Sequence, residues 1–465
     1  MQNYNQNMFN PLIYLLFTFV SINWFLIFIP AFQFASFNWF LIWTCLLSSL
    51  LIINHPFIDG LYLAATLDIS SYALLVLFIF TLIFIIFLYT LFESSVSNYK
   101  ELPTLFLIAY FGFTTLMVSN DLLILYLSIE LFSLTFYLIT TIHQNYYTTE
   151  AGIKYFIYNF LAGAFYLLGC TLIYLDYGSI NFTILGLLEP TLSSTAGIFG
   201  FIFIIISFLF KLSIAPFHFW TPDVYQGVLY PITAYFTIFP KFIIVTFFFK
   251  FYLYILYVPY LNYLLMLCGL LSVFIGTIGA FSQYNIKRLF AYSTISNAGF
   301  LIILISLGTP LASQYLFFYI LTYIIANLGV FTVLINANIS NMLGLKNIFT
   351  NNPIYALLLT LPVLSLAGLP PLVGFLAKFL SIYLIFNNNL IFVAVFLLIF
   401  SILSLFYYLR FIHYALFYEA RETEIIIPNI YQSYVIIGTS LGLLLFSFNP
   451  GLLFLTASVF STLVF

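Results

Sequence analysis

The chain has 465 residues, of which 64% are hydrophobic and only 5% are charged, and its formal net charge is −2. A soluble protein of this length could not cover its surface with so few charges, so nearly all of the chain must face lipid or other helices. The near-zero net charge also argues against nucleic acid as a partner. The composition therefore predicts an all-α polytopic membrane protein.

The cysteines and histidines are too scattered to predict a metal site or a disulfide framework. Cys45, Cys170 and Cys268 are isolated within apolar runs, which fits neither an iron–sulfur nor a zinc ligand set. No two of the four histidines are spaced so that they would pair on one helix; they are His55, His143, His218 and His413. A haem held by histidines from two different helices is the remaining alternative, and it is disfavoured. We expect no metal and no bound cofactor in this chain.

Apolar windows of about 20 residues, bounded by Pro, Asn, Gly or charge, predict the membrane helices. There are fourteen such windows, at 11–30, 37–53, 71–92, 104–119, 121–142, 150–175, 197–220, 231–256, 260–281, 288–308, 312–337, 354–385, 389–418 and 433–458. The first seven residues are polar and lack arginine, which is typical of neither a signal peptide nor a transit peptide.

The charges of the connecting loops predict the orientation of these helices. Loops after odd-numbered helices carry Lys100, Lys287, Lys346 and Arg421. Arg288 begins the helix that follows one of these loops. Loops after even-numbered helices carry no Lys or Arg but contain Asp59, Asp68, Asp176 and Glu189. The positive-inside rule then places both termini on the outer side of the membrane. We interpret Lys250, near the outer end of the eighth helix, as snorkelling to the surface.

The seventh predicted helix contains a lysine and then a helix-breaking proline. Pro216 follows Lys211 by five residues and precedes His218, and proline removes a backbone donor and clashes with the preceding turn. A charge at the centre of a bilayer costs about 2.5–3.5 kcal/mol on insertion scales. Either Lys211 snorkels from a helix end, or it is a titratable group beside a discontinuous helix, as in transporter ion sites. The apolar pattern continues past the lysine, which favours the second interpretation.

A similar proline-containing break is predicted in the twelfth helix. Residues 365–371 repeat the Ser, Ala and Pro pattern of 213–216, and Lys378 follows. The two breaks lie five helices apart, so the second copy must cross the membrane in the opposite direction. This predicts two inverted five-helix repeats, within 104–256 and 260–418, flanked by a three-helix segment at 1–103 and a final helix within 419–465.

Ionisable residues at membrane depth are the candidates for chemistry: Glu130, Lys211, Lys241 and Lys378, with Lys154 at a shallower level. Desolvation lowers the pKa of a buried lysine and a nearby carboxylate raises it, so a row of such groups favours proton transfer. The alternatives are a structural ion pair between Glu130 and Lys241, and an (i, i+4) surface pair of Lys154 with Glu150. Further polar steps could be provided by His218, Ser213, Thr233, Tyr292, Ser293 and Asn297, each of which could instead serve helix packing.

Several of these stretches resemble the subunit 2 family of respiratory complex I, the proton-pumping NADH:quinone oxidoreductase. The resemblance rests on 120–131, 150–156, 216–227, 285–293 and 364–371. Glu-Ala-Gly-Ile-Lys-Tyr-Phe at 150–156 and Trp-Thr-Pro-Asp-Val-Tyr at 220–225 point to subunit 2 among the antiporter-like subunits. A lysine beside the second break disfavours subunit 4, and the end of the chain after the fourteenth helix disfavours subunit 5.

The resemblance implies roles for the candidate residues. Glu130 and Lys211 would form a coupling pair, His218 and Lys241 a central relay, and Lys378 the exit-side lysine, while Lys154 matches a further family lysine. Two positions depart from the family pattern: residues 227–231 lack the first of two usual prolines, and Asn297 stands where many relatives carry histidine.

The resemblance also implies an assembly. Other membrane subunits of complex I would lie on both sides of this chain, within a lipid bilayer, and flavin, iron–sulfur clusters and ubiquinone would bind to other subunits. A bias toward Phe, Tyr, Ile and Asn favours the mitochondrial inner membrane over a bacterial plasma membrane. The competing functions are a stand-alone or multi-subunit cation/proton antiporter, which shares the fold, and a structural subunit with an inactive channel.

Overall fold

The computed structural model describes residues 60–62, 66–91, 101–187, 195–256, 258, 260–345, 352–417 and 430–465. The predicted helices at 11–30 and 37–53 lie outside these residues. So do Cys45, His55, Asp59, Lys100, Glu189, Lys346 and Arg421.

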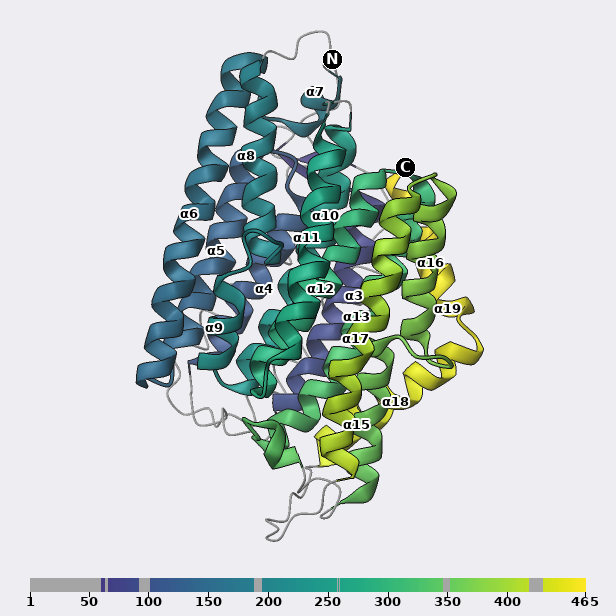
Figure 1. Ribbon diagram of the computed structural model, residues 1–465. Coiled ribbons are helices and arrows are strands. Elements are labelled where there is room, and N and C mark those ends of the chain that lie inside the picture. The colour runs from purple at the N-terminus through teal and green to yellow at the C-terminus, as the bar shows by residue number, and fades with distance from the viewer. Residues whose placement is uncertain are drawn as a thin grey trace.

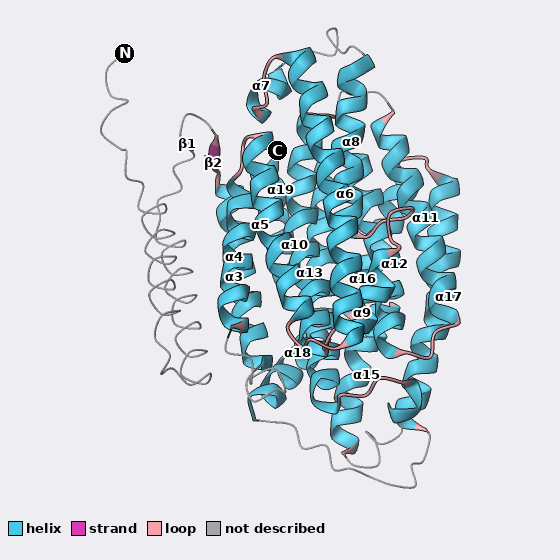
Figure 2. Cartoon of the chain, turned by 90° about the vertical axis from the view of Figure 1, so that its left-hand side faces the viewer, coloured by secondary structure: helices cyan, strands magenta, loops and turns pink. Residues whose placement is uncertain are grey.

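The chain folds into a bundle of helices that run roughly side by side (Figure 1). A two-stranded antiparallel sheet of β1 (Gly60–Tyr62) and β2 (Leu67–Ile69) precedes the helices and lies at the edge of the bundle (Figure 2). The helices of the first part are α3 (Ser71–Leu91), α4 (Leu102–Val118), α5 (Leu122–Thr141), α6 (Tyr146–Tyr177), α7 (Phe182–Leu187), α8 (Thr195–Leu212), α9 (Trp220–Gly227) and α10 (Tyr230–Tyr254).

The second part is also helical. Its helices are α11 (Leu261–Phe281), α12 (Ile286–Leu307), α13 (Pro310–Ala337), the 3₁₀ helix η3 (Met342–Leu345), α15 (Pro353–Ala367), α16 (Val373–Asn387), α17 (Ile391–Leu416), α18 (Ile430–Phe448) and α19 (Gly451–Val464). Within the described residues, ten helices are long and apolar enough to cross a membrane. The prediction of an all-α polytopic membrane protein is confirmed.

Both predicted helix breaks are present. The first separates α8 from α9, where the Ala215–Pro216 bond is cis, and the second separates α15 from α16, where the Pro370–Pro371 bond is cis. Ser213 in the first break has a left-handed backbone with φ of 58° and Gly368 in the second has φ of 83°. The chain therefore leaves the helical path at the places that the prolines predict.

Two predicted segments differ from the structure. The final helix, predicted at 433–458, is instead two helices, α18 and α19, separated near Pro450. Proline lacks a backbone donor and disfavours helical backbone at Asn449 before it, which explains the interruption. The connection predicted at 176–196 also contains the short helix α7.

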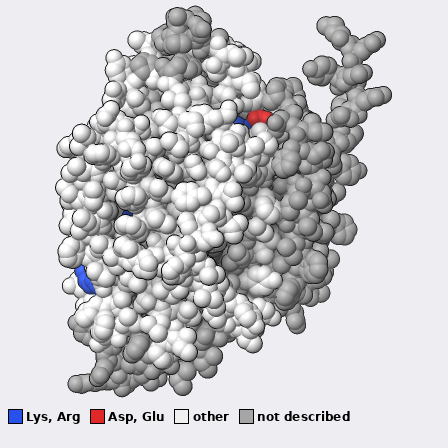
Figure 3. Space-filling view, turned by 90° about the vertical axis from the view of Figure 1, so that its right-hand side faces the viewer, with Lys and Arg blue, Asp and Glu red and all other residues white. Residues whose placement is uncertain are grey.

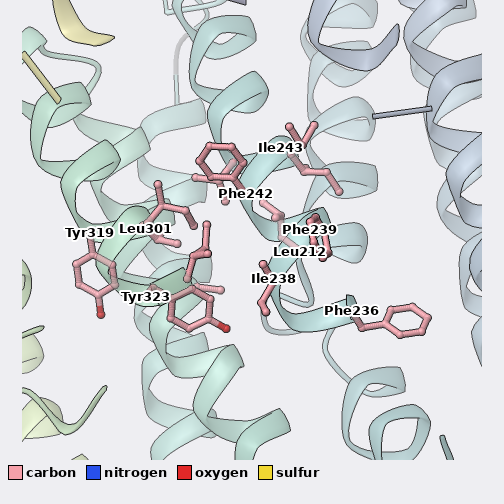
Figure 4. Packing of buried hydrophobic residues seen from close by; sticks show 14 of the residues in the cluster. Leu212, Phe236, Ile238, Phe239, Phe242, Ile243, Leu301, Tyr319 and Tyr323 are labelled. Atoms are coloured by element: carbon pink, nitrogen blue, oxygen red, sulfur yellow. The ribbon is translucent and has the colours of Figure 1, made fainter. Parts of the chain in front are cut away.

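The centre of the bundle is formed by α10, α12 and α13. In an 18-residue apolar window of each helix, all residues of α10 and 94% of those of α12 and α13 are buried. In the corresponding windows of α6 and α17, only 33% of the residues are buried. Aromatic and aliphatic side chains of α10, including Phe239 and Phe242, pack close to Leu301 and Tyr323 in this core (Figure 4). The surface viewed in Figure 3 has few charged side chains among the described residues, as a lipid-facing surface requires.

Candidate functional site

The first break holds Lys211 inside the protein. Lys211 lies in the last turn of α8, and its ammonium donates a hydrogen bond to Asn159 Oδ1 of α6. The carbonyl of Phe210 accepts from the Ser213 N–H at 3.1 Å and from Trp220 Nε1 at 3.0 Å. Because the indole belongs to α9, it helps to satisfy the open C-terminal end of α8 across the break. The lysine is thus placed by a terminated helix, not by a free end at the surface.

Glu130 lies near this lysine without touching it. Its carboxylate is partly buried on α5, where Ser133 Oγ donates to Oε2 at 3.3 Å. A Cβ built on Gly163 of α6 would be 2.8 Å from Glu130 Oε1, so the glycine leaves the space that the carboxylate uses. Glu130 acts electrostatically on Lys211. Among the ion pairs of the described residues, however, none joins Glu130 to Lys211 or to Lys241.

Lys241 shares a small cavity with Lys211. It follows Pro240 in α10, is 3% exposed, and donates a hydrogen bond to the Thr294 carbonyl of α12 at 3.0 Å. The first cavity has a volume of about 20 Å³, which is room for about one water molecule. Its polar lining consists of Lys211, Lys241, Asn159, Tyr155, Tyr158, Ser213, Tyr225 and Trp220. Two lysines that are 30 positions apart in the sequence therefore meet at one polar space.

Lys378 lies beside the second break, in α16. Its ammonium donates to the carbonyls of Leu366 and Ala367, both at 2.9 Å, in the last turn of α15. A cation is favoured at this end of a helix because the free carbonyls carry partial negative charge. Gly368 packs directly against the Lys378 side chain: a Cβ there would lie 2.8 Å from Lys378 Cδ.

A second cavity of about 10 Å³ lies beside Lys378. Its polar lining consists of Asn297, Tyr319, Thr322, Tyr323, Ser365 and Lys378. Asn297, the position that departs from the family pattern, therefore lies in the same polar space as Lys378.

His218 is buried in the first break but lines neither cavity. It is 7% exposed, and its ring centroid lies 4.6 Å from that of Phe219. Its Nδ1 has no hydrogen-bond partner among the described residues. The structure therefore does not bring His218 into the polar spaces shared by the lysines.

Lys154 lies in a partly exposed ion network. Its ammonium is 2.8 Å from Glu150 Oε1 and 2.8 Å from Asp223 Oδ2, and 37% of its side chain is exposed. Arg288 Nη2 approaches Asp223 Oδ1 at 3.5 Å. The (i, i+4) pair with Glu150 is confirmed, and Asp223 of α9 extends it to α12. Lys154 thus joins three helices at the end of the bundle where α6 begins.

The interpretation of Lys250 as a snorkelling lysine is wrong. Its ammonium forms an ion pair with Asp68 Oδ2 at 2.7 Å, and the two side chains are only 13% and 17% exposed. Ser70 lies 3.3 Å away as a further partner. The pairing became possible because the strand β2 brings Asp68 against the end of α10, a contact across 182 positions that the sequence does not reveal.

Several polar residues that line the cavities were not named as candidates from the sequence, among them Asn159, Tyr225 and Tyr323. Asn159, the direct partner of Lys211, could have been noticed as an amide within the apolar stretch of α6. Tyr225 ends the motif at 220–225, which could have marked it, whereas Tyr323 gave no such signal among the 37 tyrosines of the chain. Within the described residues, no group of three or more His, Cys, Asp or Glu side chains could hold a metal ion.

Comparison with known proteins places the chain in a family. Residues 119–404 match the family described as NADH:quinone oxidoreductase/Mrp antiporter, transmembrane. NADH-quinone oxidoreductase subunit N of Wolbachia sp. subsp. Brugia malayi is 35% identical over 329 residues, which cover 69% of this chain and 71% of that protein. NADH-ubiquinone oxidoreductase chain 2 of Marchantia polymorpha is 32% identical over 346 residues, which cover 72% and 71%.

A solved structure agrees with these relatives. A chain in respiratory complex I from Thermus thermophilus with bound aureothin superposes with a TM-score of 0.83 and 26% identity, covering 95% of this chain and 98% of its own length. The chain therefore belongs to the NADH:quinone oxidoreductase/Mrp antiporter family, in the group that contains the subunit N and chain 2 proteins.

Proposed function

We propose that this chain is the proton-translocating subunit 2 of respiratory complex I, an H⁺-translocating NADH:quinone oxidoreductase. The relatives that cover about 70% of the chain carry the names of complex I subunits, so the cation/proton antiporter alternative is not favoured. The observation that carries the proposal is that the partly buried Lys211 and the buried Lys241 and Lys378 line two small polar cavities. Such charges are expensive to keep at this depth unless they have a function.

The proposed relay runs from Glu130 and Lys211, through Lys241, to Lys378. The field of Glu130 favours the charged form of Lys211, and if this carboxylate moves away, desolvation disfavours the charge and the proton leaves. Moving one charge across about 100 mV costs about 2.3 kcal/mol, and a change of a few kcal/mol in proton affinity is typical of buried groups. His218 would serve at the first break, outside the two cavities, and Lys154 would act at the rim of α6.

In the proposed architecture, each half of the chain contributes one broken helix and one lysine beside it to the proton relay. Residues 104–256 and 260–418 would be inverted repeats, each with a broken helix and a buried lysine at the break, while 1–103 and 419–465 would flank them. In support, Lys211 lies in the last turn of α8 and Lys378 contacts the last turn of α15, and both of these helices end at a proline-containing break. A pseudo-two-fold axis in the membrane plane would relate the two halves.

The proposed assembly places electron transfer outside this chain. Flavin, iron–sulfur clusters and ubiquinone would bind to other subunits, and no redox centre would belong to this one. Other membrane subunits would contact it on two sides, with lipid covering the rest. The abundance of Phe, with 60 residues, and of Tyr, with 37, supports a mitochondrial inner membrane location over a bacterial plasma membrane.

The test is proton translocation by the assembled complex with Lys211→Met or Lys378→Met. Methionine keeps a similar volume and removes the titratable charge, so the protons moved per electron should fall, and quinone reduction should fall too if the steps are tightly coupled. Variants are compared only where the complex assembles at normal abundance. If both assembled variants keep the wild-type proton-to-electron ratio and rate, the proposed relay is wrong.

A further inference from the structure

The two cavities approach each other through α12. The first contains Lys241, whose ammonium bonds to the Thr294 carbonyl, and the second contains Asn297. Thr294 and Asn297 are three residues apart on one helix, which corresponds to about 4.5 Å along its axis and to neighbouring positions on its surface. The partner of Lys241 and a lining residue of the Lys378 cavity therefore lie within about one turn of each other on α12.

Asn297 is poorly suited to carry a proton between the two cavities. Its Oδ1 accepts a hydrogen bond from the Tyr319 hydroxyl at 3.0 Å, and its Nδ2 donates to the Ser293 carbonyl at 2.9 Å. A side-chain amide does not titrate, and here both of its polar ends are already engaged. Another polar group must provide the connection between the cavities.

Two tyrosines meet this requirement. Tyr225 of α9 lines the first cavity and lies beside Thr294. Tyr323 of α13 lines the second cavity, together with Asn297 and Lys378. Each cavity therefore has one of these two tyrosines in its lining, Tyr225 in the first and Tyr323 in the second.

The Tyr323 hydroxyl is buried without a hydrogen-bond partner among the described residues. Asn327, one turn further along α13, lies nearby, and its Oδ1 is also unpartnered. A buried polar group left unsatisfied costs about 1–3 kcal/mol. Figure 4 shows Tyr319 and Tyr323 at successive turns of one helix. The Tyr319 hydroxyl already donates a hydrogen bond to Asn297, whereas the Tyr323 hydroxyl has no hydrogen-bond partner among the described residues.

We propose that the hydroxyl of Tyr323, with that of Tyr225, conducts protons from the Lys241 cavity to the Lys378 cavity, in place of a titratable side chain at position 297. The tyrosine oxygen accepts a proton from the Lys241 side, directly or through water, while its own proton passes to the Lys378 side. One O–H bond forms as another breaks, and no group is oxidised or reduced. This inference rests on the function proposed above.

The matched comparison is Tyr323→Phe against Tyr235→Phe in the assembled complex. Each variant removes one buried hydroxyl without a hydrogen-bond partner among the described residues, but Tyr235 lines neither cavity. Removing a proton-transfer group typically slows the step that it serves by ~10²–10⁴-fold, so we expect about a tenfold or larger loss of proton translocation in Tyr323→Phe. Tyr235→Phe should keep the wild-type rate.

A rescue experiment separates proton transfer from packing. Histidine at position 297 would place a titratable ring in the second cavity, so Asn297→His added to Tyr323→Phe should restore translocation. A Tyr323→Phe complex that pumps like the wild type, or one that has lost pumping and is not restored by Asn297→His, would overturn the proposal. Lys378→Met in the same assay tests the underlying function. If neither Lys378→Met nor Tyr323→Phe affects pumping, the proposed relay itself is wrong. If Lys378→Met abolishes pumping and Tyr323→Phe does not affect it, only the proposed role of the tyrosines is wrong.

Discussion

Two of the candidate charged residues, Glu130 and Lys378, each pack against a glycine. A larger residue in place of either glycine would occupy the space that the charged side chain uses. Gly163 of α6 faces the Glu130 carboxylate and Gly368 faces the stem of Lys378. The carboxylate is the flexible end of a side chain, whereas the Lys378 stem is held by two hydrogen bonds at its ammonium. The position of Glu130 is therefore the more easily altered of the two.

Gly163→Ala should displace the Glu130 carboxylate without preventing folding. The new Cβ would approach Oε1 at 2.8 Å, so the carboxylate must shift and its electrostatic effect on Lys211 should change. We expect slower proton translocation at normal complex abundance. Gly438→Ala is the control, since no heavy atom lies within 4 Å of its Cβ position. Equal translocation rates in the two variants would show that the position of Glu130 is not critical.

At the level of secondary structure, the two broken helices differ in how their C-terminal carbonyls are satisfied. In α8 the side chain of Trp220 contributes from the far side of the break, whereas in α15 Lys378 of the following helix does so. The second arrangement links the charge of a candidate relay residue directly to a helix end. A change in the protonation of Lys378 would therefore act on the contact between α15 and α16.

Gly374→Ala should disrupt this contact. A Cβ on Gly374 would lie 1.9 Å from the Ser365 carbonyl oxygen, a backbone atom that cannot move alone. Overpacking typically costs about 1–3 kcal/mol and more where backbone must shift, so less assembled complex and a lower inactivation temperature are expected. Gly442→Ala, whose nearest neighbour is Phe446 Cε2 at 3.7 Å, should be neutral or slightly stabilising because alanine favours helix. Similar stability of both variants would contradict the tight contact.

The breaks could be predicted from the sequence because proline acts locally, whatever the helix packs against. Pro216 and the pair at 370–371 marked them, and Pro450 could have marked the division of α18 from α19. The partners of the charges could not be predicted, because they depend on which helices meet. Asn159 is 52 positions from Lys211, and Asp68 is 182 positions from Lys250.

At the scale of the whole molecule, the polar residues are concentrated inside an apolar bundle. The cavities lie beside α10, α12 and α13, the most buried helices, while the surface seen in Figure 3 has few charges. A surface with so few charges is suited to lipid and to other membrane subunits.

The chain should therefore co-purify in mild detergent with an NADH-oxidising particle that contains flavin and iron–sulfur clusters. Optical spectra and activity of the isolated particle would check this. Isolation of the chain as a stable protein that translocates protons without neighbours would instead support the antiporter alternative.

The most direct test of the relay is the proton-to-electron ratio of the assembled complex with Lys378→Arg. Arginine keeps the positive charge and can still donate hydrogen bonds to the Leu366 and Ala367 carbonyls, but it does not release its proton at physiological pH. Complex abundance is measured in parallel, with Lys378→Met as the variant that removes the charge. If Lys378 transfers protons, the assembled Lys378→Arg complex should lose translocation as fully as Lys378→Met. A wild-type ratio in Lys378→Arg would show that Lys378 only stabilises the end of α15, and the relay would be contradicted.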